Sequence, residues 1–185
     1  PLIIPKSDSP KMFDAIAKRY DLLNRLLSFG QDVRWRNSLV KLLPQQQELK
    51  VLDLATGTAD VLIALAQHNQ NIKTGIGLDP AAKMLEIGQQ KIKSKILEGR
   101  LTLQLGDAQA LPFLADTFDC VTIAFGIRNI PDLRLALLEM FRVTKPGGCV
   151  LILEFSKPPS FFMALGHWFY LNVVVPMVGY LVSGN

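Results

Sequence analysis

Acidic and polar side chains stand at the ends of several apolar runs in this chain of 185 residues. Asp79, the pair Asp107 and Ala108, and the pair Arg128 and Asn129 each follow such a run. If the runs are neighbouring parallel strands, their carboxyl ends meet at one edge of a sheet, where ligands bind. An acid about 20 residues beyond a glycine turn can accept hydrogen bonds from both hydroxyls of a ribose. The spacing therefore predicts a nucleoside-cofactor site, with Asp79 at the ribose and Asp107 and Ala108 at the edge of the base.

The stretch Lys50–Val61, KVLDLATGTADV, reads as a buried strand, a turn of small residues and the start of a helix. Small side chains let a cofactor approach the main chain closely. A dinucleotide fingerprint needs G-x-G-x-x-G, whereas this turn has Gly57 alone. Asp53 and Asp60 flank the turn, and two acids suit the ammonium and sulfonium of S-adenosylmethionine better than a pyrophosphate. Asp53 has a second interpretation, as an acid that only fixes N–H groups of the turn.

Apolar runs alternate with helical periodicity along most of the chain. This alternation predicts right-handed βαβ units and a parallel sheet with helices on both faces. The fold class is thus α/β, a Rossmann-like doubly wound parallel sheet, preceded by an N-terminal addition of two helices within residues 11–43. We expect Asp32 to cap the second of these helices. The expected strands cover residues 51–55, 72–78, 101–105, 118–125 and 149–155, and the expected core helices cover residues 60–67, 81–95 and 133–143.

Composition and charge exclude several classes of protein. The formal net charge is +4, and no basic run is dense enough to indicate a nucleic-acid partner. Two cysteines and two histidines without ligand spacing argue against a metal site. Residues 161–182 are very apolar and pass the length test for a membrane span. Because Gly166, Pro176 and Gly179 interrupt this stretch, the favoured interpretation is a helix that forms the wall of an apolar cavity or packs on sequence not present here.

Several longer stretches resemble one family. The stretches LDLATGTAD and GDAQALPF resemble class I S-adenosylmethionine methyltransferases. YDLLNRLLSFGQDVRW at residues 20–35, FGIRN at residues 125–129 and RVTKPGGCVLILEFS at residues 142–156 resemble the ubiquinone/menaquinone biosynthesis C-methyltransferases. The resemblance covers the chain from Met12 onward. It implies a single methyltransferase domain over residues 11–185, with N-terminal helices at 11–48, a cofactor-binding core at 50–156 and an apolar substrate-side segment at 157–185.

The resemblance also implies roles for individual residues. It assigns cofactor contacts to Thr58, Asp79, Asp107 and Ala108, beside Asp53 and Gly57 from the turn. Our hypothesis for catalysis names Arg128, Asn129 and Tyr20, as follows. Arg128 stabilises a phenolate-like oxygen or holds a proton-accepting water, since arginine itself is a poor base, and Asn129 and Tyr20 orient the quinol oxygens. The other interpretation of Arg128 is a salt bridge to a nearby acid such as Asp132.

The implied function is S-adenosylmethionine-dependent C-methylation of a polyprenyl quinol, with demethylmenaquinol favoured and the ubiquinone-pathway quinol left open. Three alternatives remain: a methyltransferase of another small molecule, a cofactor-binding subunit without activity, and a membrane-anchored protein that uses the last apolar stretch as a span. We expect a cytoplasmic protein with peripheral membrane contact and no nucleic-acid partner, in a homodimer or a biosynthetic complex.

The chain departs from the family's pattern in four respects. Asp32 stands where a histidine is usual, Thr144 where an aliphatic residue is usual, and Ala59 where many relatives have glycine. We also expect the closing antiparallel strands of the family to be missing from this chain.

Overall fold

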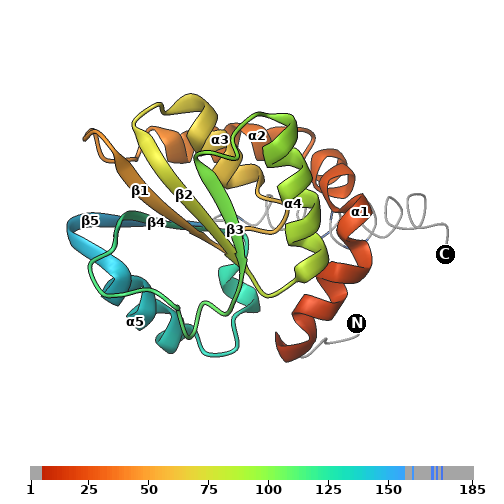
Figure 1. Cartoon of the computed structure of the whole chain (residues 1–185). Coiled ribbons are helices and arrows are strands. Elements are labelled where there is room, and N and C mark those ends of the chain that lie inside the picture. Colours follow the sequence, from red (N-terminus) through yellow and green to blue (C-terminus); the bar gives the residue numbers. More distant parts are fainter. Residues whose placement is uncertain (1–5, 157–159, 161–167, 169, 171, 173–185) are drawn as a thin grey trace.

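Five parallel strands form a single sheet, in the order β3-β2-β1-β4-β5 (Figure 1). The computed structural model describes residues 6–156 together with Ser160, Trp168, Tyr170 and Asn172. The strands are β1 (Leu49–Leu54), β2 (Ile72–Asp79), β3 (Leu101–Leu105), β4 (Phe118–Ala124) and β5 (Thr144–Leu153). The helices are η1 (Lys6–Asp8), α1 (Ser9–Leu27), α2 (Gln31–Val40), α3 (Asp60–His68), α4 (Ala82–Ser94), η2 (Ile127–Asn129) and α5 (Leu133–Val143). This arrangement confirms the predicted α/β class with two added N-terminal helices.

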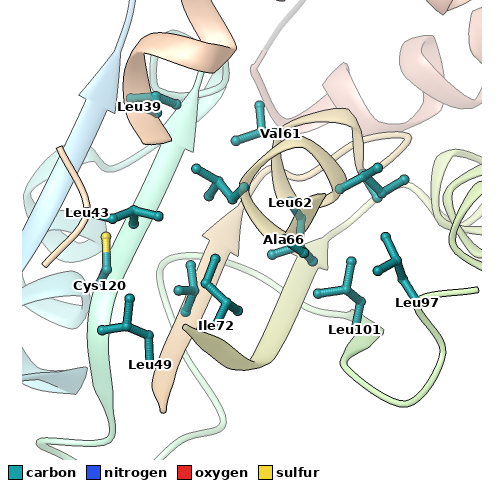
Figure 2. Packing of buried hydrophobic residues seen from close by; sticks show 14 of the residues in the cluster. Leu39, Leu43, Leu49, Val61, Leu62, Ala66, Ile72, Leu97, Leu101 and Cys120 are labelled. Carbon is teal, nitrogen blue, oxygen red and sulfur yellow. The ribbon is translucent and has the colours of Figure 1, made fainter. Parts of the chain in front are cut away.

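The central strand β1 supplies side chains to both faces of the sheet, because successive residues of a strand point in opposite directions. Leu49 and Val51 belong to a core cluster with residues of α2 and α3, including Leu39 and Leu62. Figure 2 shows this cluster between the helices and the strands. A strand buried on both faces must be apolar almost throughout, which explains why β1 and β4 contain so few polar residues.

The opposite face of the sheet is covered by α5. Ala136, Met140 and Val143 follow one another at four- and three-residue steps and are fully buried. They pack in a second cluster with Leu52 of β1 and Phe118 of β4. The Asp132 carboxylate caps α5 by accepting a hydrogen bond from the Leu135 N–H at 3.1 Å. Burial of one apolar stripe therefore holds this helix against the sheet.

The N-terminal helices α1 and α2 are separated at residues 28–30, within the region where the sequence predicted two helices. The prediction that Asp32 caps the second helix is wrong, since the N-cap residue is Gly30. Asp32 lies inside α2, is 4% exposed and is paired with Arg36 at 2.5 Å. A partner one helical turn away satisfies the carboxylate better than backbone N–H groups at the helix end would.

The last strand differs from its predicted bounds. It begins at Thr144, five residues before the expected start at Cys149. Thr144 pairs with Phe118 and Cys149 pairs with Cys120, so residues 145–148 form an irregularity in the register. The Pro-Gly-Gly sequence at 146–148 follows the helix α5, but it is accommodated as a bulge inside the strand.

Two predictions concern the end of the chain. The apolar stretch at residues 161–182 lies outside the described residues, apart from Trp168, Tyr170 and Asn172. Among the helices that the structure describes, none combines the length and the apolar character needed to cross a bilayer. The division of residues 11–185 into three parts of one domain stays a prediction.

Candidate active site

A cavity of about 350 Å³ opens at the carboxyl ends of the central strands. Its walls come from five parts of the chain, within residues 6–20, 55–57, 78–84, 107–109 and 124–131. β1 lies between β2 and β4, so the strand order reverses beside this cavity. Ligands bind at such a switch point in open parallel sheets. The strand ends that the sequence singled out therefore meet around one space.

The turn after β1 is tightly folded against its surroundings. Ala55 and Ala59 adopt left-handed conformations, with φ of 49° and 64°. Such conformations cost a non-glycine residue free energy and cluster at functional sites. Gly126 approaches the turn so closely that an added Cβ would lie 2.4 Å from the Cβ of Ala55. The backbone after β4 and the backbone after β1 thus together form one side of the cavity.

Asp79 fixes this turn to the start of α4. One of its oxygens accepts a hydrogen bond from the Gly57 N–H and the other from the Ala81 N–H, both at 2.8 Å. Burial raises the pKa of the Asp79 carboxyl, while these two hydrogen bonds act in the opposite direction. Because each carboxylate oxygen has two lone pairs, both retain a free acceptor site at the cavity wall. Contact of Asp79 with a ribose stays a prediction.

Asp107 and Ala108 line the same cavity beyond β3. The Asp107 carboxylate accepts hydrogen bonds from the backbone N–H and the side-chain amide of Gln109, each at 2.9 Å. The Gln109 carbonyl oxygen in turn accepts from the Asp132 N–H at 2.9 Å. The end of β3 is thereby tied to the segment before α5, and this tie holds Asp107 in place.

A second, smaller cavity of about 50 Å³ adjoins the first behind the turn. The two share wall residues, among them Tyr20, Gly57 and Phe125. Asp53 lies at the smaller cavity and is 1% exposed. Its two oxygens accept hydrogen bonds from the hydroxyls of Thr56 and Thr122, both at 2.6 Å.

Burial raises the pKa of Asp53 to about 6, although the two hydroxyl donors lower it. The interpretation of Asp53 as an acid that fixes turn N–H groups is not what the geometry shows, since the donors to its carboxylate are the two threonine hydroxyls. An ionised carboxylate here has no cation among these donors. It therefore favours a positively charged ligand group in the smaller cavity.

Thr58 lies at the smaller cavity and not at the larger one. Its hydroxyl donates to the Asp21 carboxylate at 2.6 Å and accepts from the Lys91 ammonium at 2.8 Å. Asp21 belongs to α1 and Lys91 to α4, so helices from distant parts of the sequence meet at this hydroxyl. Sequence reasoning singled out Thr58 but missed both partners.

The three residues of the catalytic hypothesis occupy different positions. Tyr20 lines both cavities and Asn129 lines the larger one. The rings of Tyr20 and Phe13 pack edge to face, with their centroids 5.9 Å apart. Burial raises the pKa of the Tyr20 hydroxyl. Arg128 is outside the walls of both cavities, with its side chain 52% exposed. The structure therefore brings together two of the three residues.

Arg128 is ion-paired with Glu154 and not with Asp132, so the partner anticipated from the sequence was wrong. The Asp132 carboxylate instead caps α5. The guanidinium carbon of Arg128 also lies 5.6 Å from the centre of the Phe155 ring. A catalytic role for Arg128 stays a prediction.

An aromatic group that sequence reasoning missed stands beside the cavities. Trp35, Phe125 and Phe155 contact one another, with ring centroids 5.9 Å, 5.6 Å and 4.7 Å apart. Phe125 lines both cavities. All three residues lie in the stretches that carried the family resemblance, and this was the signal by which they could have been found.

Taken together, the parallel sheet, the switch-point cavity and the acids at its strand ends define an α/β domain of the nucleoside-cofactor-binding class. Comparison with known sequences then gives the particular family. The chain belongs to the ubiE/COQ5 methyltransferase family, whose pattern matches residues 6–185. The resemblance stated from the sequence is confirmed, and the chain is a methyltransferase.

Two curated relatives and one solved structure illustrate the similarity. The ubiquinone/menaquinone biosynthesis C-methyltransferase UbiE of Geotalea daltonii is 45% identical over 174 residues, which are 94% of this chain and 74% of that protein. The demethylmenaquinone methyltransferase of Thermus thermophilus is 46% identical over 174 residues, 94% of this chain and 78% of that protein. A putative S-adenosyl-L-methionine-dependent methyltransferase of Methanococcus maripaludis has a TM-score of 0.68 at 20% identity, covering 86% of this chain and 72% of that one. At this identity the structure supports the fold alone.

Proposed function

We propose that this chain transfers a methyl group from S-adenosylmethionine to a ring carbon of a polyprenyl quinol, with demethylmenaquinol as the favoured acceptor. The observation that carries the proposal is the switch-point cavity, whose walls include Asp79, Asp107, Tyr20 and Asn129. The curated relatives named above support the choice of acceptor, because one is a demethylmenaquinone methyltransferase and the other acts in both quinone pathways by its name. The ubiquinone-pathway quinol therefore remains a second acceptor to be tested.

The residues at the cavities match the chemistry of the proposed cofactor. Asp79 keeps free acceptor sites for the ribose hydroxyls, and Asp107 with Ala108 lies where the base edge would be read. Asp53 is a buried acid whose hydrogen-bond donors are two neutral hydroxyls, and it suits the positively charged end. Gly126 leaves the wall free of a side chain where the two backbones are closest. The cofactor supplies a methyl group on a positively charged sulfur, which departs as a neutral thioether.

Residues of this chain prepare the acceptor for attack. Methyl transfer from sulfur to carbon needs an aligned nucleophile and exclusion of water more than acid–base catalysis. Phe13, Tyr20 and Phe125 give the cavity its apolar walls. The Tyr20 hydroxyl and the Asn129 amide hold the quinol oxygens, and Arg128 stabilises the negative charge that the ring oxygen carries when it loses its proton. A C–C bond forms as the S–C bond breaks, and the ring carbon then gives its proton to water. The ring oxygen takes a proton back, so the net release is one proton.

A polyprenyl substrate resides in a membrane, so we also propose peripheral contact with an anionic lipid surface. The outer side of α1 and the following turn carries Lys18, Leu22, Leu26 and Phe29, with the three apolar side chains 54%, 46% and 78% exposed. Trp168 is 59% exposed, and the ring centroids of Tyr170 and Phe29 are 6.4 Å apart. Basic residues beside exposed aromatic and aliphatic ones favour binding at a membrane interface. A homodimer or a biosynthetic complex stays a prediction.

The decisive experiment follows the methyl group. Purified protein is incubated with methyl-labelled S-adenosylmethionine and either reduced demethylmenaquinone or a reduced ubiquinone-pathway acceptor, and the lipid is extracted. We expect label in the demethylmenaquinone sample, with Asn129→Ala as a variant of reduced rate. Binding of S-adenosylmethionine without transfer to either lipid would refute the proposed enzyme activity and favour a cofactor-binding subunit.

A further inference from the structure

We propose that Lys91 is a positioning residue that holds helix α1 and the cofactor turn together. It is part of a chain of alternating charges that keeps the wall of the cofactor cavity in place. The inference rests on the proposed function only in that the cavity binds S-adenosylmethionine or its demethylated product. It adds a role for Lys91, which lines neither cavity.

Three elements converge on the Lys91 ammonium. It lies 2.6 Å from the Asp21 carboxylate of α1, 2.6 Å from the Asp60 carboxylate of α3 and 2.8 Å from the Thr58 hydroxyl of the turn. An ammonium group has three donors, and each of the three has an acceptor here. Asp21 also accepts from Thr58 at 2.6 Å, which closes a small ring of contacts around the turn.

The charges continue from Asp60 into α2. The second oxygen of Asp60 is 2.7 Å from Arg36, and Arg36 is 2.5 Å from Asp32. The order Asp21, Lys91, Asp60, Arg36, Asp32 therefore alternates in sign from end to end. Its links join α1, α4, α3 and α2, so both N-terminal helices are tied to the start of the helix that follows the turn.

Besides these links, helix α1 is held by a hydrogen bond from the Lys83 N–H to the Asp14 carboxylate at 2.8 Å, by an ion pair of Arg25 with Asp32 at 3.6 Å and by few buried apolar side chains. Its buried apolar contact is a small cluster in which Ala17 meets Ala81 and Met84, with Phe13 and Tyr20 packed at the side. Phe13 and Tyr20 also form part of the cavity wall. Displacement of α1 would therefore open the larger cavity to water and remove the proposed contact of Tyr20 with the quinol.

The ion pairs of Lys91 are neither fully exposed nor fully buried, so their contribution to stability should be intermediate. The side chains of Lys91, Asp60 and Asp21 are 25%, 29% and 37% exposed. Exposed ion pairs contribute little and are screened by salt, whereas removal of one partner from a buried pair is strongly destabilising. Partly buried links should hold α1 closed at low salt and weaken as salt is added. Since only the closed form binds well, the apparent Kd rises as its population falls.

The test measures binding of S-adenosylhomocysteine by calorimetry at about 0.05 M and about 0.5 M NaCl. We expect Lys91→Gln to raise the Kd about tenfold at low salt. Lys93→Gln is the matched control, because it removes the same charge from an exposed position on the same helix. The affinity of the wild-type protein should fall with salt, and the affinity of the Lys91→Gln variant should change less.

A second variant separates positioning from a general loss of structure. Asp21→Ala removes the link between α1 and Lys91 while leaving Lys91 and Asp60 paired. The double variant should lose little more affinity than either single variant, because both act through one contact. Circular dichroism confirms that each variant is folded under the assay conditions.

Each outcome decides the matter. An unchanged Kd for Lys91→Gln, equal losses in Lys91→Gln and Lys93→Gln, or additive losses in the double variant would each overturn the inference alone. A wild-type protein that binds no S-adenosylhomocysteine would instead refute the proposed function, and the inference with it. Methyl transfer to the quinol is not needed for any of these measurements.

Discussion

Asp53→Asn is expected to make the protein more stable at neutral pH, although it removes a residue of the candidate site. Asp53 is buried, and its pKa rises from 3.8 to about 6 on folding. One pKa unit corresponds to about 1.4 kcal/mol. The ionised carboxylate therefore costs the folded state about 3 kcal/mol at pH values well above 6. Asparagine fills the same space without the charge, and its amide can still meet both threonine hydroxyls.

The pH dependence gives the sign of the effect. Below pH 3.8 the carboxyl is protonated in both states, so it adds no penalty to folding. Between pH 3.8 and about 6 the folded protein retains a proton that the unfolded chain releases. The free energy of unfolding therefore falls as the pH rises through this range. Above about 6 the penalty is constant. The advantage of the variant should therefore be about 3 kcal/mol at about pH 7.5 and about half of that at about pH 5.

The assay is urea unfolding followed by circular dichroism at both pH values. Asp119→Asn is a control of opposite sign. Burial alone would raise the pKa of Asp119, but hydrogen bonds from Lys145 at 2.7 Å and from the Lys50 N–H at 2.8 Å leave it below its usual value. Its loss should destabilise the protein. If Asp53→Asn is no more stable than the wild type at pH 7.5, or if its advantage does not shrink at pH 5, the account of Asp53 is wrong.

The gain in stability of Asp53→Asn should be accompanied by weaker binding of the cofactor. If Asp53 faces the positively charged end of the cofactor, Asp53→Asn should bind S-adenosylmethionine about tenfold more weakly at pH 7.5. Calorimetry at two pH values tests this, since the affinity of the wild type should also fall as Asp53 becomes protonated below about 6. A destabilising residue kept at a binding site is a common trade of stability for activity.

Four further substitutions give separate tests. Gly88→Ala should lower the melting temperature, because the new Cβ would lie 3.2 Å from the backbone of Thr58. Such overpacking costs about 1–3 kcal/mol, which outweighs a gain in helix propensity of about 1 kcal/mol. Asp79→Ala should reduce cofactor affinity at least about tenfold by calorimetry, since two backbone donors lose their acceptor. Arg128→Ala should lower kcat about 100-fold with cofactor Kd unchanged; an unchanged rate would contradict its assigned role. Phe29→Ser should reduce sedimentation with anionic vesicles, and equal sedimentation would count against the proposed membrane face.

The fold was predictable from the sequence because its elements have strong local signals. β4 and α5 lie close to their predicted bounds, and both are marked by long apolar or periodic patterns. β5 was misjudged at its start because Pro146, Gly147 and Gly148 are usual signs of a loop. Pairing of Thr144 with Phe118 overrides that signal, and this pairing depends on a strand far away in the sequence.

The site was predictable where the position of a residue follows from strand order. Asp79 and Asp107 end neighbouring strands, so their meeting at one cavity needed no knowledge of side-chain packing. The partners of Thr58 and Arg128 could not be found in this way. Lys91 contacts Thr58, and Glu154 contacts Arg128, through the tertiary fold. No local sequence pattern specifies which of several charged residues will form these contacts.

The strand order also determines when the cofactor can help the chain to fold. The partner of β1 on one side, β2, is complete at Asp79, but its other neighbour, β4, is completed only at Ala124. The larger cavity needs wall residues up to Pro131. A ligand stabilises only those states that bind it, so nascent chains that end before Pro131 gain nothing from the cofactor. During translation this family member must rely on its apolar clusters and its ion pairs, and cofactor supply in the cell affects only the finished fold.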